Sequence, residues 1–284
     1  KRDGITVKIL TGDNEAVTRN VGKQVGLDIT SVYQGKDLEN KSSAELKKMV
    51  KECDVFVKLS PQQKAQIIQL LRENNHTVAY MGDGINDAPA MKAADVAISV
   101  DTAVDIAKKS ADIILLHKDL IILEKGVQIG RQVFGNTMKY IKITLSSNFG
   151  NILSILVASS FLPFLPMLPV QLLILDLMYG TSCLSIPFDT MNKHYLSEPR
   201  KWSTKKLPKF MFYFGPTSSI FDIITFALLF FIVCPQIIGS SYAGATASQK
   251  LLFSAVFCTG WFIESLWTQE MVIHALRDPG LPFI

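Results

Sequence analysis

Hydrophobic and polar positions follow two different patterns along the chain. Up to about residue 135, short apolar runs alternate with amphipathic segments, whereas long apolar runs dominate from about residue 141 onward. Short buried strands that alternate with helices are typical of a parallel sheet covered on both faces, and about 20 apolar residues suffice to cross a bilayer as a helix. We therefore expect an α/β domain at 1–135 and an all-α transmembrane domain at 136–284.

The first half is predicted to alternate between strands and helices. Ser60 followed by Pro61 marks one helix start, because serine is a favoured N-cap and proline suits the first turn. Two expected strands end in Thr11-Gly12-Asp13 and Gly82-Asp83-Gly84, and parallel sheets bind ligands at the carboxyl ends of their strands. Both acidic segments are therefore expected at one sheet edge. The expected strands are 5–10, 55–59, 78–81, 96–100 and 113–116, and the expected helices are 14–25, 61–73 and 86–93.

Apolar segments in the second half are candidate membrane spans. The second segment contains Asp176 and Gly180 and ends at Pro187, which predicts a partly unwound helix lining a polar path. A helix that starts near residue 119 is expected to continue without interruption into the first span. A soluble apolar core is the alternative interpretation. The four spans are expected at about 141–162, 170–186, 210–234 and 251–267.

Charges between the spans indicate an orientation. The segment 189–209 is basic, whereas 235–249 carries no charged residue. Cytoplasmic loops carry an excess of Lys and Arg, which places 189–209 in the cytoplasm. If the spans alternate, residues 1–135 lie on the same side. We therefore expect a multi-pass protein of the cell membrane, embedded in the lipid bilayer, with a cytoplasmic first half.

Composition argues against several other functions. The net charge is only +4, and the basic residues form no stripe interleaved with aromatic residues, so no nucleic-acid partner is expected. The four cysteines are scattered without a Cys-x-x-Cys spacing, which argues against a zinc or redox site.

The chain begins at Lys1 and ends at Ile284 in sequence typical of a domain interior. We expect both ends to be cuts within a longer protein.

A pair of carboxylates is the strongest candidate for chemistry. Asp83 and Asp87 lie four residues apart in a glycine-containing turn between a strand and a helix, with Asn86 between them. Carboxylate and amide oxygens suit Mg²⁺, which proteins typically hold through one or two carboxylates plus phosphate and water. A turn with acidic helix caps is the alternative, and it would be preferred for an isolated Gly-Asp-Gly. The longer segment Met81–Ala90 favours the magnesium interpretation.

A second group of residues is suited to a phosphoryl group. Thr11, Gly12 and Asp13 follow a strand and precede a helix, where a hydroxyl and backbone amides can bind an anion, although a simple helix N-cap is the better interpretation of this segment in isolation. Lys64 could neutralise phosphate charge, whereas an exposed surface lysine is the alternative. A hydroxyl, a lysine and two carboxylates at one sheet edge predict a phosphoryl-transfer site that needs a nucleophile.

Three segments together resemble successive signatures of the P-type ATPases, which are ion pumps with a haloacid dehalogenase-like phosphorylation domain. The segments are Thr11-Gly12-Asp13, Ser60–Lys64 and Met81–Ala90. The resemblance covers the whole chain, because four spans follow where the family places its fifth to eighth transmembrane helices. It implies a Rossmann-type parallel sheet. It also implies that Thr11 and Gly12 contact the phosphoryl group, Asp13 supports them, Lys64 neutralises charge, and Asp83 and Asp87 hold the catalytic Mg²⁺ with Asn86 nearby.

The chain departs from this family in one large respect. The Asp-Lys-Thr-Gly-Thr segment, whose aspartate the family phosphorylates with ATP, does not occur in the sequence. The nucleotide-binding domain, the actuator domain and the first four membrane helices are also missing. The resemblance thus implies Mg²⁺ and ATP as cofactors and the missing N-terminal part of the same pump as a partner. The fragment alone is expected to be inactive.

Polar residues within the spans are candidate ligands for a transported cation. Between Thr144 and Ser154 they recur at three- and four-residue spacing, which gives one polar stripe. Such residues often only hold membrane helices together, but an intramembrane carboxylate suggests a functional site. We expect Asn148, Asn151 and Asp176 to bind the cation. Glu264 is a further candidate, with a place near the membrane interface or a structural hydrogen bond as its alternatives.

Further segments resemble the bacterial magnesium-importing P-type ATPases. Calcium pumps typically place a glutamate where Asn151 stands, and an amide fits a weakly liganded Mg²⁺. Similar magnesium pumps usually show an asparagine at the position of Asp176 and an aspartate at that of Gly180, so the carboxylate here is displaced by one helical turn. The segments are Ser146–Asn151, Leu177–Tyr179, Glu198–Trp202 and Gly215–Asp222.

The resemblance implies import of Mg²⁺, a divalent cation, through an aspartyl-phosphate cycle. Two alternatives stay open. The protein could be a P-type pump for Ca²⁺ or another cation, or it could be a non-catalytic membrane regulator that reuses half of a pump.

Overall fold

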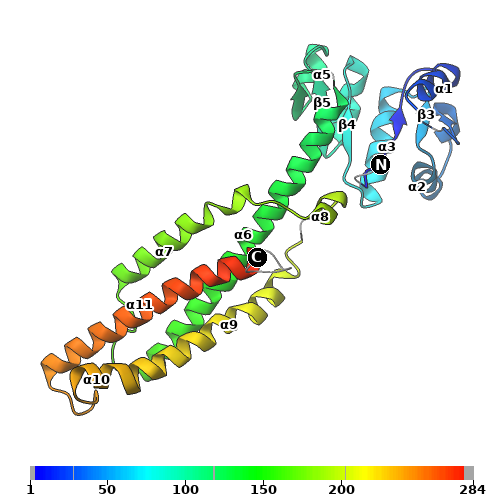
Figure 1. Ribbon diagram of the computed structural model, residues 1–284. Helices are drawn as coiled ribbons and strands as arrows, with labels where there is room; N and C mark the ends of the chain where they lie inside the picture. Colours follow the sequence, from blue (N-terminus) through cyan, green and yellow to red (C-terminus); the bar gives the residue numbers. More distant parts are fainter. Residues whose placement is uncertain (1–3, 28, 118, 202, 278–284) are drawn as a thin grey trace. The chain divides into compact units, whose positions relative to one another are not determined.

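The computed structural model describes residues 4–27, 29–117, 119–201 and 203–277, so Trp202 of the Glu198–Trp202 segment lies outside it. The chain forms two compact units, Lys1–Gln128 and Ile129–Ile284, which we call the first and second unit (Figure 1). The sequence pattern predicts this division slightly later, at residue 135.

The first unit contains two parallel three-stranded sheets. In one sheet β3 lies between β1 and β2, and in the other β5 lies between β4 and β6. Leu10 of β1 pairs with Phe56, and Met81 of β4 pairs with Ile98. β1 and β4 are thus edge strands, and each ends directly before one of the two acidic segments. The strands are β1 (Ile9–Leu10), β2 (Tyr33–Gln34), β3 (Val55–Val57), β4 (Ala79–Met81), β5 (Val96–Val100) and β6 (Ile113–Leu115).

Helix α3 (Pro61–Glu73) contributes to the hydrophobic cores of both sheets. Ile68 packs in the core of the β4-β5-β6 sheet, and its neighbour Ile67 packs in the core of the β1-β3-β2 sheet. The helix start is fixed by a capping box, in which the Ser60 amide donates to the Gln63 side chain at 2.9 Å and the Gln63 amide donates to the Ser60 hydroxyl at 3.2 Å. Both contacts hold the first turn of α3, and with it Lys64, in place.

The sequence pattern misses several short elements of the first unit. The largest is α2 (Ser43–Glu52), although Ser42 and Glu45 form a capping box at its start. The pattern also misses η1 (Gly35–Leu38) and α5 (Asp105–Lys109). The predicted helix 14–25 corresponds to α1 (Glu15–Gln24), and the predicted helix 86–93 corresponds to η2 (Ile85–Asp87) and α4 (Ala88–Ala93).

Four helical segments among the described residues are long and apolar enough to cross a membrane, judged by length and composition alone. α6 is one uninterrupted helix from Leu120 to Phe161, which confirms the predicted continuity into the first span. α6 and α9 begin before their predicted spans, α11 extends beyond its predicted span at both ends, and η4 and α10 continue the third segment after α9. The other elements are α7 (Pro169–Cys183), η3 (Ile186–Phe188), α8 (Lys193–Ser197), α9 (Leu207–Leu228), the π-helical η4 (Leu229–Val233), α10 (Cys234–Ile238) and α11 (Ala247–Arg277).

The prediction of a partly unwound second span is wrong for α7. Asp176 and Gly180 lie inside an uninterrupted α-helix. A glycine costs a helix interior only about 1 kcal/mol relative to alanine, which the surrounding residues can offset. The backbone leaves α-helical geometry only after Cys183, where Pro187 lies in the 3₁₀ turn η3.

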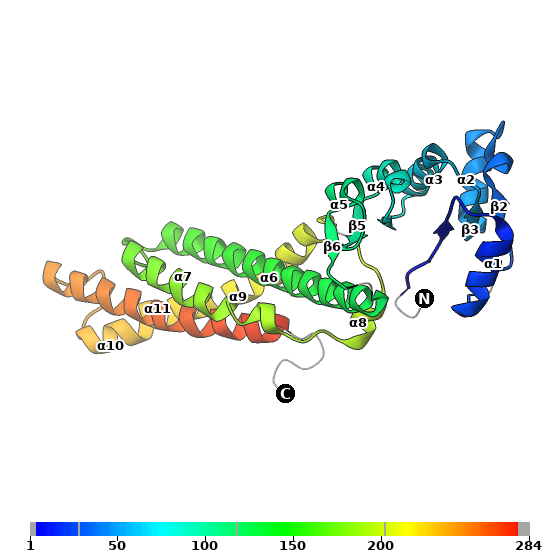
Figure 2. The ribbon, with the colours of Figure 1, turned by 90° about the horizontal axis from the view of Figure 1, so that it is seen from above.

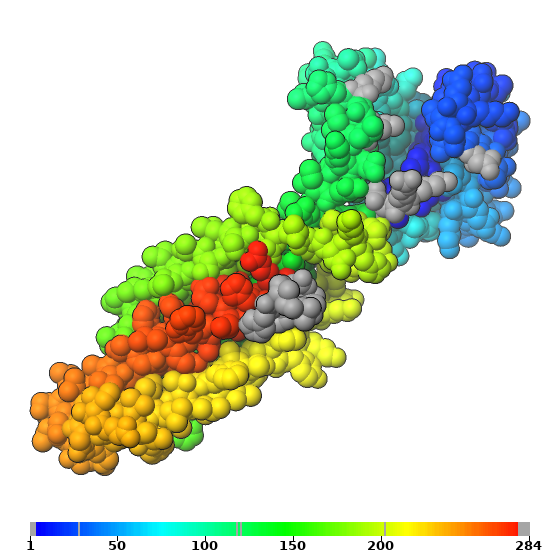
Figure 3. All heavy atoms as spheres, viewed as in Figure 1, coloured from blue at the N-terminus to red at the C-terminus, as the bar shows by residue number. Residues whose placement is uncertain are grey.

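α11 is the central helix of the second unit. It packs against both α7 and α9, and it lies between them on the face seen in Figures 1 and 3. Figure 2 shows α6, α7 and α11 extending along one another in a second view. Phe226 of α9 meets Phe257 and Trp261 of α11, with ring centroids 5.8 and 4.8 Å apart. Aromatic packing therefore fixes how α9 and α11 face each other.

α6 and α9 approach closely at two glycines. A Cβ atom at Gly150 would lie 2.8 Å from the Gly215 carbonyl oxygen and would also collide with Ser218. The Ser219 hydroxyl donates to the Gly150 carbonyl at 2.9 Å. Small residues at a helix crossing let the two backbones come together, which is a common way to pack helices in membranes.

Candidate functional site

Four of the predicted site residues line one cavity of about 530 Å³ in the first unit. Thr11 directly follows β1, and Lys64 lies in the first turn of α3. Asp83 and Asp87 come after β4, in the segment that leads to α4. Three separate elements thus bring a hydroxyl, an ammonium group and two carboxylates to one place.

The cavity lies between the edge strands β1 and β4. Leu10 and Thr11 line it from the β1 side, and Tyr80 and Met81 line it from the β4 side. Within the described residues, β1 pairs only with β3 and β4 only with β5, so each presents one edge without a neighbouring strand. Such an edge carries backbone groups ready to pair with another strand.

The Asp87 carboxylate is held by three donors. Its Oδ1 atom accepts hydrogen bonds from Lys64 Nζ and from the Tyr80 hydroxyl, each at 2.8 Å. Its Oδ2 atom accepts from the Gly84 amide at 3.2 Å. The side chains of Lys64 and Asp87 are only 10% and 15% exposed, so this ion pair is largely removed from water. Tyr80 was not predicted, because a tyrosine in a short strand is indistinguishable from an ordinary core residue.

These contacts set the protonation states around Asp87. Burial alone raises the pKa of the Asp87 carboxyl, but hydrogen bonds from Lys64 and Tyr80, together with the Lys64 charge, outweigh burial and hold the pKa below its ordinary value. Burial also raises the pKa of the Tyr80 phenol, and the neighbouring Asp87 raises it further. At neutral pH Asp87 is therefore ionised while Tyr80 remains a neutral donor.

Thr11 and Asp13 form a small turn beside the cavity. The Thr11 hydroxyl donates to Asp13 Oδ2 at 3.0 Å and accepts from the Asp13 amide at 3.1 Å. The Asp13 carbonyl accepts from the Lys58 amide at 2.9 Å, which ties this turn to the end of β3. Asp13 thus orients the hydroxyl of Thr11 without lining the cavity itself.

Other predicted residues of the first unit lie around the cavity, outside its lining. Gly12 and Asn86 are both exposed. Gly82 shows why a glycine stands after β4, since a Cβ there would lie 2.5 Å from the Asp87 Cβ. No group of three or more His, Cys, Asp or Glu side chains in the described part of the chain is arranged to hold a metal ion. Two carboxylates nonetheless fit Mg²⁺, which keeps several water or phosphate oxygens as ligands.

The predicted cation ligands of the second unit differ in exposure. Asn148 on α6 and Asp176 on α7 are exposed, and Asn151 is half-buried. The polar residues of α6 therefore lie on two sides of the helix. Ser147 and Ser154 are buried in the bundle, whereas Asn148 is exposed.

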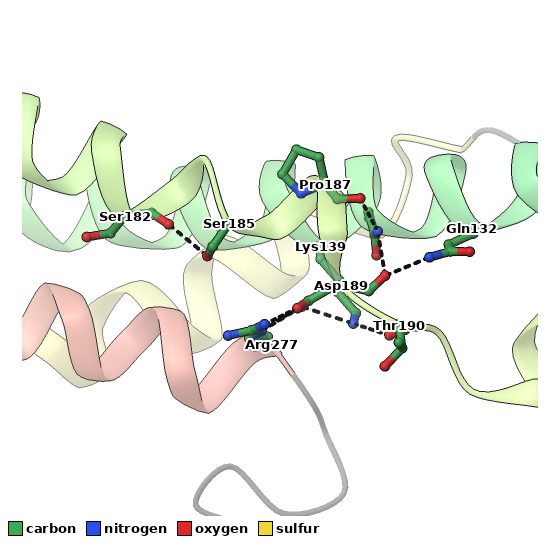
Figure 4. A network of polar contacts seen from close by, with 9 residues as sticks. Gln132, Lys139, Ser182, Ser185, Pro187, Asp189, Thr190 and Arg277 are labelled. Atoms are coloured by element: carbon green, nitrogen blue, oxygen red, sulfur yellow. Dashed lines mark hydrogen bonds and ion pairs between the residues drawn. The ribbon is translucent and has the colours of Figure 1, made fainter.

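A polar network that sequence reasoning missed surrounds Asp189 (Figure 4). The Asp189 carboxylate accepts from Arg277 Nε at 2.6 and 2.7 Å, and Lys139 Nζ lies 3.6 Å from its Oδ2 atom. Its backbone carbonyl accepts from the side-chain amides of Gln132 and Asn136 at 3.0 and 2.9 Å. Asp189 is 5% exposed. It joins α6, the segment after α7 and the end of α11, and no local motif marks such distant partners.

Comparisons with known proteins agree with this architecture. Residues 1–95 match the haloacid dehalogenase-like hydrolase family. Over 282 residues, 99% of the chain, the sequence is 51% identical to the "Magnesium-transporting ATPase, P-type 1" of Salmonella typhimurium. It is 49% identical, over its whole length, to the protein of the same name in Escherichia coli. The "Calcium-transporting ATPase" of Bacillus subtilis is 35% identical over 61% of the chain and 20% of that protein.

The chain combines an α/β unit of the haloacid dehalogenase type with four long apolar helices, and over nearly its whole length it is homologous to P-type ATPases. Among these, the chain is a homologue of the bacterial magnesium-transporting enzymes and corresponds to their C-terminal part. It spans about 30% of the length of these two relatives.

Proposed function

We propose that the full-length protein is an ATP-driven pump that imports Mg²⁺ through an aspartyl-phosphate cycle. The observation that carries the proposal is the cavity between β1 and β4, which gathers Thr11, Lys64, Asp83 and Asp87. Whole-chain identity of 51% to a magnesium-transporting ATPase supports the choice of ion.

Each residue of the cavity has a role in this proposal. The Thr11 hydroxyl and the Gly12 backbone bind the phosphoryl group, and Asp13 orients the hydroxyl. Lys64 neutralises phosphate charge, while its bond to Asp87 holds the ammonium group at the cavity. Asp83 and Asp87 hold the catalytic Mg²⁺ with Asn86 close by; Asp87 retains an acceptor position on Oδ2, since a carboxylate offers about four and three are used. The bound Mg²⁺ supplies positive charge that favours phosphoryl transfer.

The nucleophile is expected from a further strand. The relatives are about three times longer than the part that the chain matches, and the chain lacks an Asp-Lys-Thr-Gly-Thr segment. A parallel strand that ends in this segment would pair with the open edges of β1 and β4 and would place its aspartate at the cavity. ATP would then phosphorylate that aspartate.

In the second unit, we propose that Asn148, Asn151 and Asp176 bind the transported Mg²⁺. The exposure of Asn148 and Asp176 supports this role, because both are open to ligands or to helices that the chain does not include. The basic segment 189–209 supports a cytoplasmic position for that loop and for the first unit.

Replacing Asp83 tests the site. In the full-length protein, Asp83→Asn should abolish phosphoenzyme formation or turnover, because a neutral amide binds Mg²⁺ far more weakly than a carboxylate. Asp105→Asn is the matched control, since Asp105 is 88% exposed on α5 and away from the cavity lining. Normal phosphorylation by the Asp83 variant would refute its role as a metal ligand.

Two alternatives are separated by simple observations. If Ca²⁺ stimulates ATP hydrolysis by the full-length protein and Mg²⁺ transport is absent, the protein is a pump for another cation. If the upstream coding sequence lacks Asp-Lys-Thr-Gly-Thr, a non-catalytic regulator is favoured instead.

A further inference from the structure

A buried carboxylate connects three helices of the second unit. Asp222 on α9 is 3% exposed, and both of its oxygens are occupied. Oδ2 accepts from the Ser154 hydroxyl of α6 at 2.5 Å, and Oδ1 accepts from the indole N–H of Trp261 on α11 at 2.8 Å. Ser154 and Trp261 are themselves buried, at 0% and 2% exposure. Nothing in the proposed phosphoryl or magnesium chemistry uses this cluster.

Glu264 completes the cluster from the same face of α11 as Trp261, three residues further along the helix. One turn of α11 separates it from Trp261, whose indole donates to Asp222, so Glu264 and Asp222 are neighbours that interact electrostatically. Its Oε2 atom is buried, and it finds no hydrogen-bond donor among the described residues. Two acidic side chains therefore meet in an apolar bundle with one oxygen still unsatisfied.

Two neighbouring carboxylates that are both ionised are not a stable arrangement in a buried site. Like charges that share a dry site repel each other strongly, so one group of such a pair stays protonated. Two donors already stabilise a negative charge on Asp222. A proton on Glu264 supplies a third donor to Asp222 and removes the second charge from the bundle.

We propose that Asp222 and Glu264 form a proton-binding site between α9 and α11, with the proton carried by Glu264 and donated to Asp222. Ser154 and Trp261 each donate to one oxygen of Asp222, and the Glu264 proton takes a further acceptor position on that carboxylate. Release of the proton would place two charges side by side and weaken the contact between the two helices.

Other titratable groups on the surrounding helices lie apart from this pair. From α7, Cys183 lies near Glu270 of α11, and the Ser182 hydroxyl donates to Glu270 at 2.6 Å. From α10, Cys234 lies near Cys258 of α11. α6 contributes the uncharged Ser154. Within the described part of the chain, Asp222 is thus the titratable group that neighbours Glu264.

Two amide substitutions in the full-length protein test the site. Glu264→Gln keeps the shape of a protonated glutamic acid and its ability to donate, so we expect an unchanged melting temperature. Asp222→Asn turns an amide toward the Trp261 and Ser154 donors, so we expect a loss of several degrees or failure to fold. Glu270→Gln is the control on the same helix, because it alters a carboxylate outside the cluster.

Infrared spectroscopy reads the proton directly. The wild-type protein at neutral pH should show the C=O stretching band of a protonated carboxyl group, which shifts in D₂O. Glu264→Gln should lose this band and Glu270→Gln should keep it. Absence of the band in the wild type, its persistence in Glu264→Gln, or destabilisation or misfolding of Glu264→Gln would overturn the inference. Neither measurement requires transport, so failure here is distinguishable from failure of the magnesium-pump proposal.

Discussion

At the scale of single residues, Asp87 organises the cavity of the first unit. Lys64, Tyr80 and Gly84 all donate to its carboxylate, from a helix, a strand and a turn respectively. Because Lys64 and Asp87 are largely buried, each depends on the other for compensation of its charge. The stability of the first unit and the position of the lysine ammonium group are therefore linked.

Removing the lysine charge should be costly. We expect Lys64→Met to destabilise the first unit by about 3 kcal/mol, because it leaves the buried Asp87 carboxylate without its counter-ion. Lys47→Met is the control: Lys47 lies 2.9 Å from Glu73, but both side chains are well exposed, so its loss should cost at most about 1 kcal/mol. Chemical denaturation of both variants measures the difference. Equal losses of unfolding free energy in the two variants would contradict the conclusion that burial makes the Lys64–Asp87 ion pair the more important one.

The lowered pKa of Asp87 predicts a dependence of stability on acidity. A folded-state pKa below the unfolded value of about 4 means that ionised Asp87 stabilises the fold above that pH. This contribution should disappear as the pH falls through the folded-state pKa. The difference in unfolding free energy between the wild type and Asp87→Asn should thus shrink on acidification. A difference that stays constant from neutral to strongly acidic pH would contradict the assignment.

At the scale of elements, the crossing of α6 and α9 depends on small residues. Gly150 and Gly215 leave no room for an added methyl group, whereas nothing lies within 4 Å of a Cβ built at Gly130, also on α6. An alanine should therefore lower stability at position 150 and raise it at position 130, although both positions lie on α6.

Alanine substitutions test this crossing. Gly150→Ala should destabilise the bundle by about 1–3 kcal/mol, because the methyl group overpacks the contact with α9. Gly130→Ala should instead stabilise α6 by about 0.5–1 kcal/mol, because alanine is the better helix former. Thermal unfolding in detergent compares the two variants. A stable Gly150→Ala protein would show that α6 and α9 do not meet as described.

The elements that could be predicted from the sequence are those with local signals. α3 begins at the predicted Ser60-Pro61 and ends at the predicted Glu73, since its cap and apolar period lie within the helix. β2 has only two residues and was missed for that reason, whereas the lysine-rich α2 was missed although it begins with a capping box of its own. α7 was predicted as broken because Gly180 and Asp176 are locally unfavourable, yet the helix continues through both.

The site residues, like the elements, could be predicted only where the local sequence carries a signal. Thr11, Lys64, Asp83 and Asp87 belong to recognisable segments, so their gathering at one cavity was predictable from strand ends and family signatures. The partners of Asp222 and Asp189 were not, because Ser154 and Arg277 lie 68 and 88 residues away in the chain. Contacts of this kind depend on the packing of the whole bundle.

At the scale of the whole molecule, the chain combines a cavity lined by Thr11, Lys64, Asp83 and Asp87 with four candidate membrane spans. It corresponds to about 30% of its magnesium-transporting relatives, and it contains no nucleophilic aspartate segment of its own. We propose for the full-length protein that phosphorylation at the edge between β1 and β4 drives movement of Mg²⁺ through the membrane helices.

Uptake of Mg²⁺ by vesicles that contain the purified full-length protein tests this claim most directly. We expect ATP added on the side of the first unit to drive movement of Mg²⁺ toward that side, and Asp83→Asn to reduce the rate to background. Ca²⁺ in place of Mg²⁺ as the transported ion should not be moved. ATP-driven Ca²⁺ transport without Mg²⁺ transport, or unchanged Mg²⁺ transport by Asp83→Asn, would contradict the account.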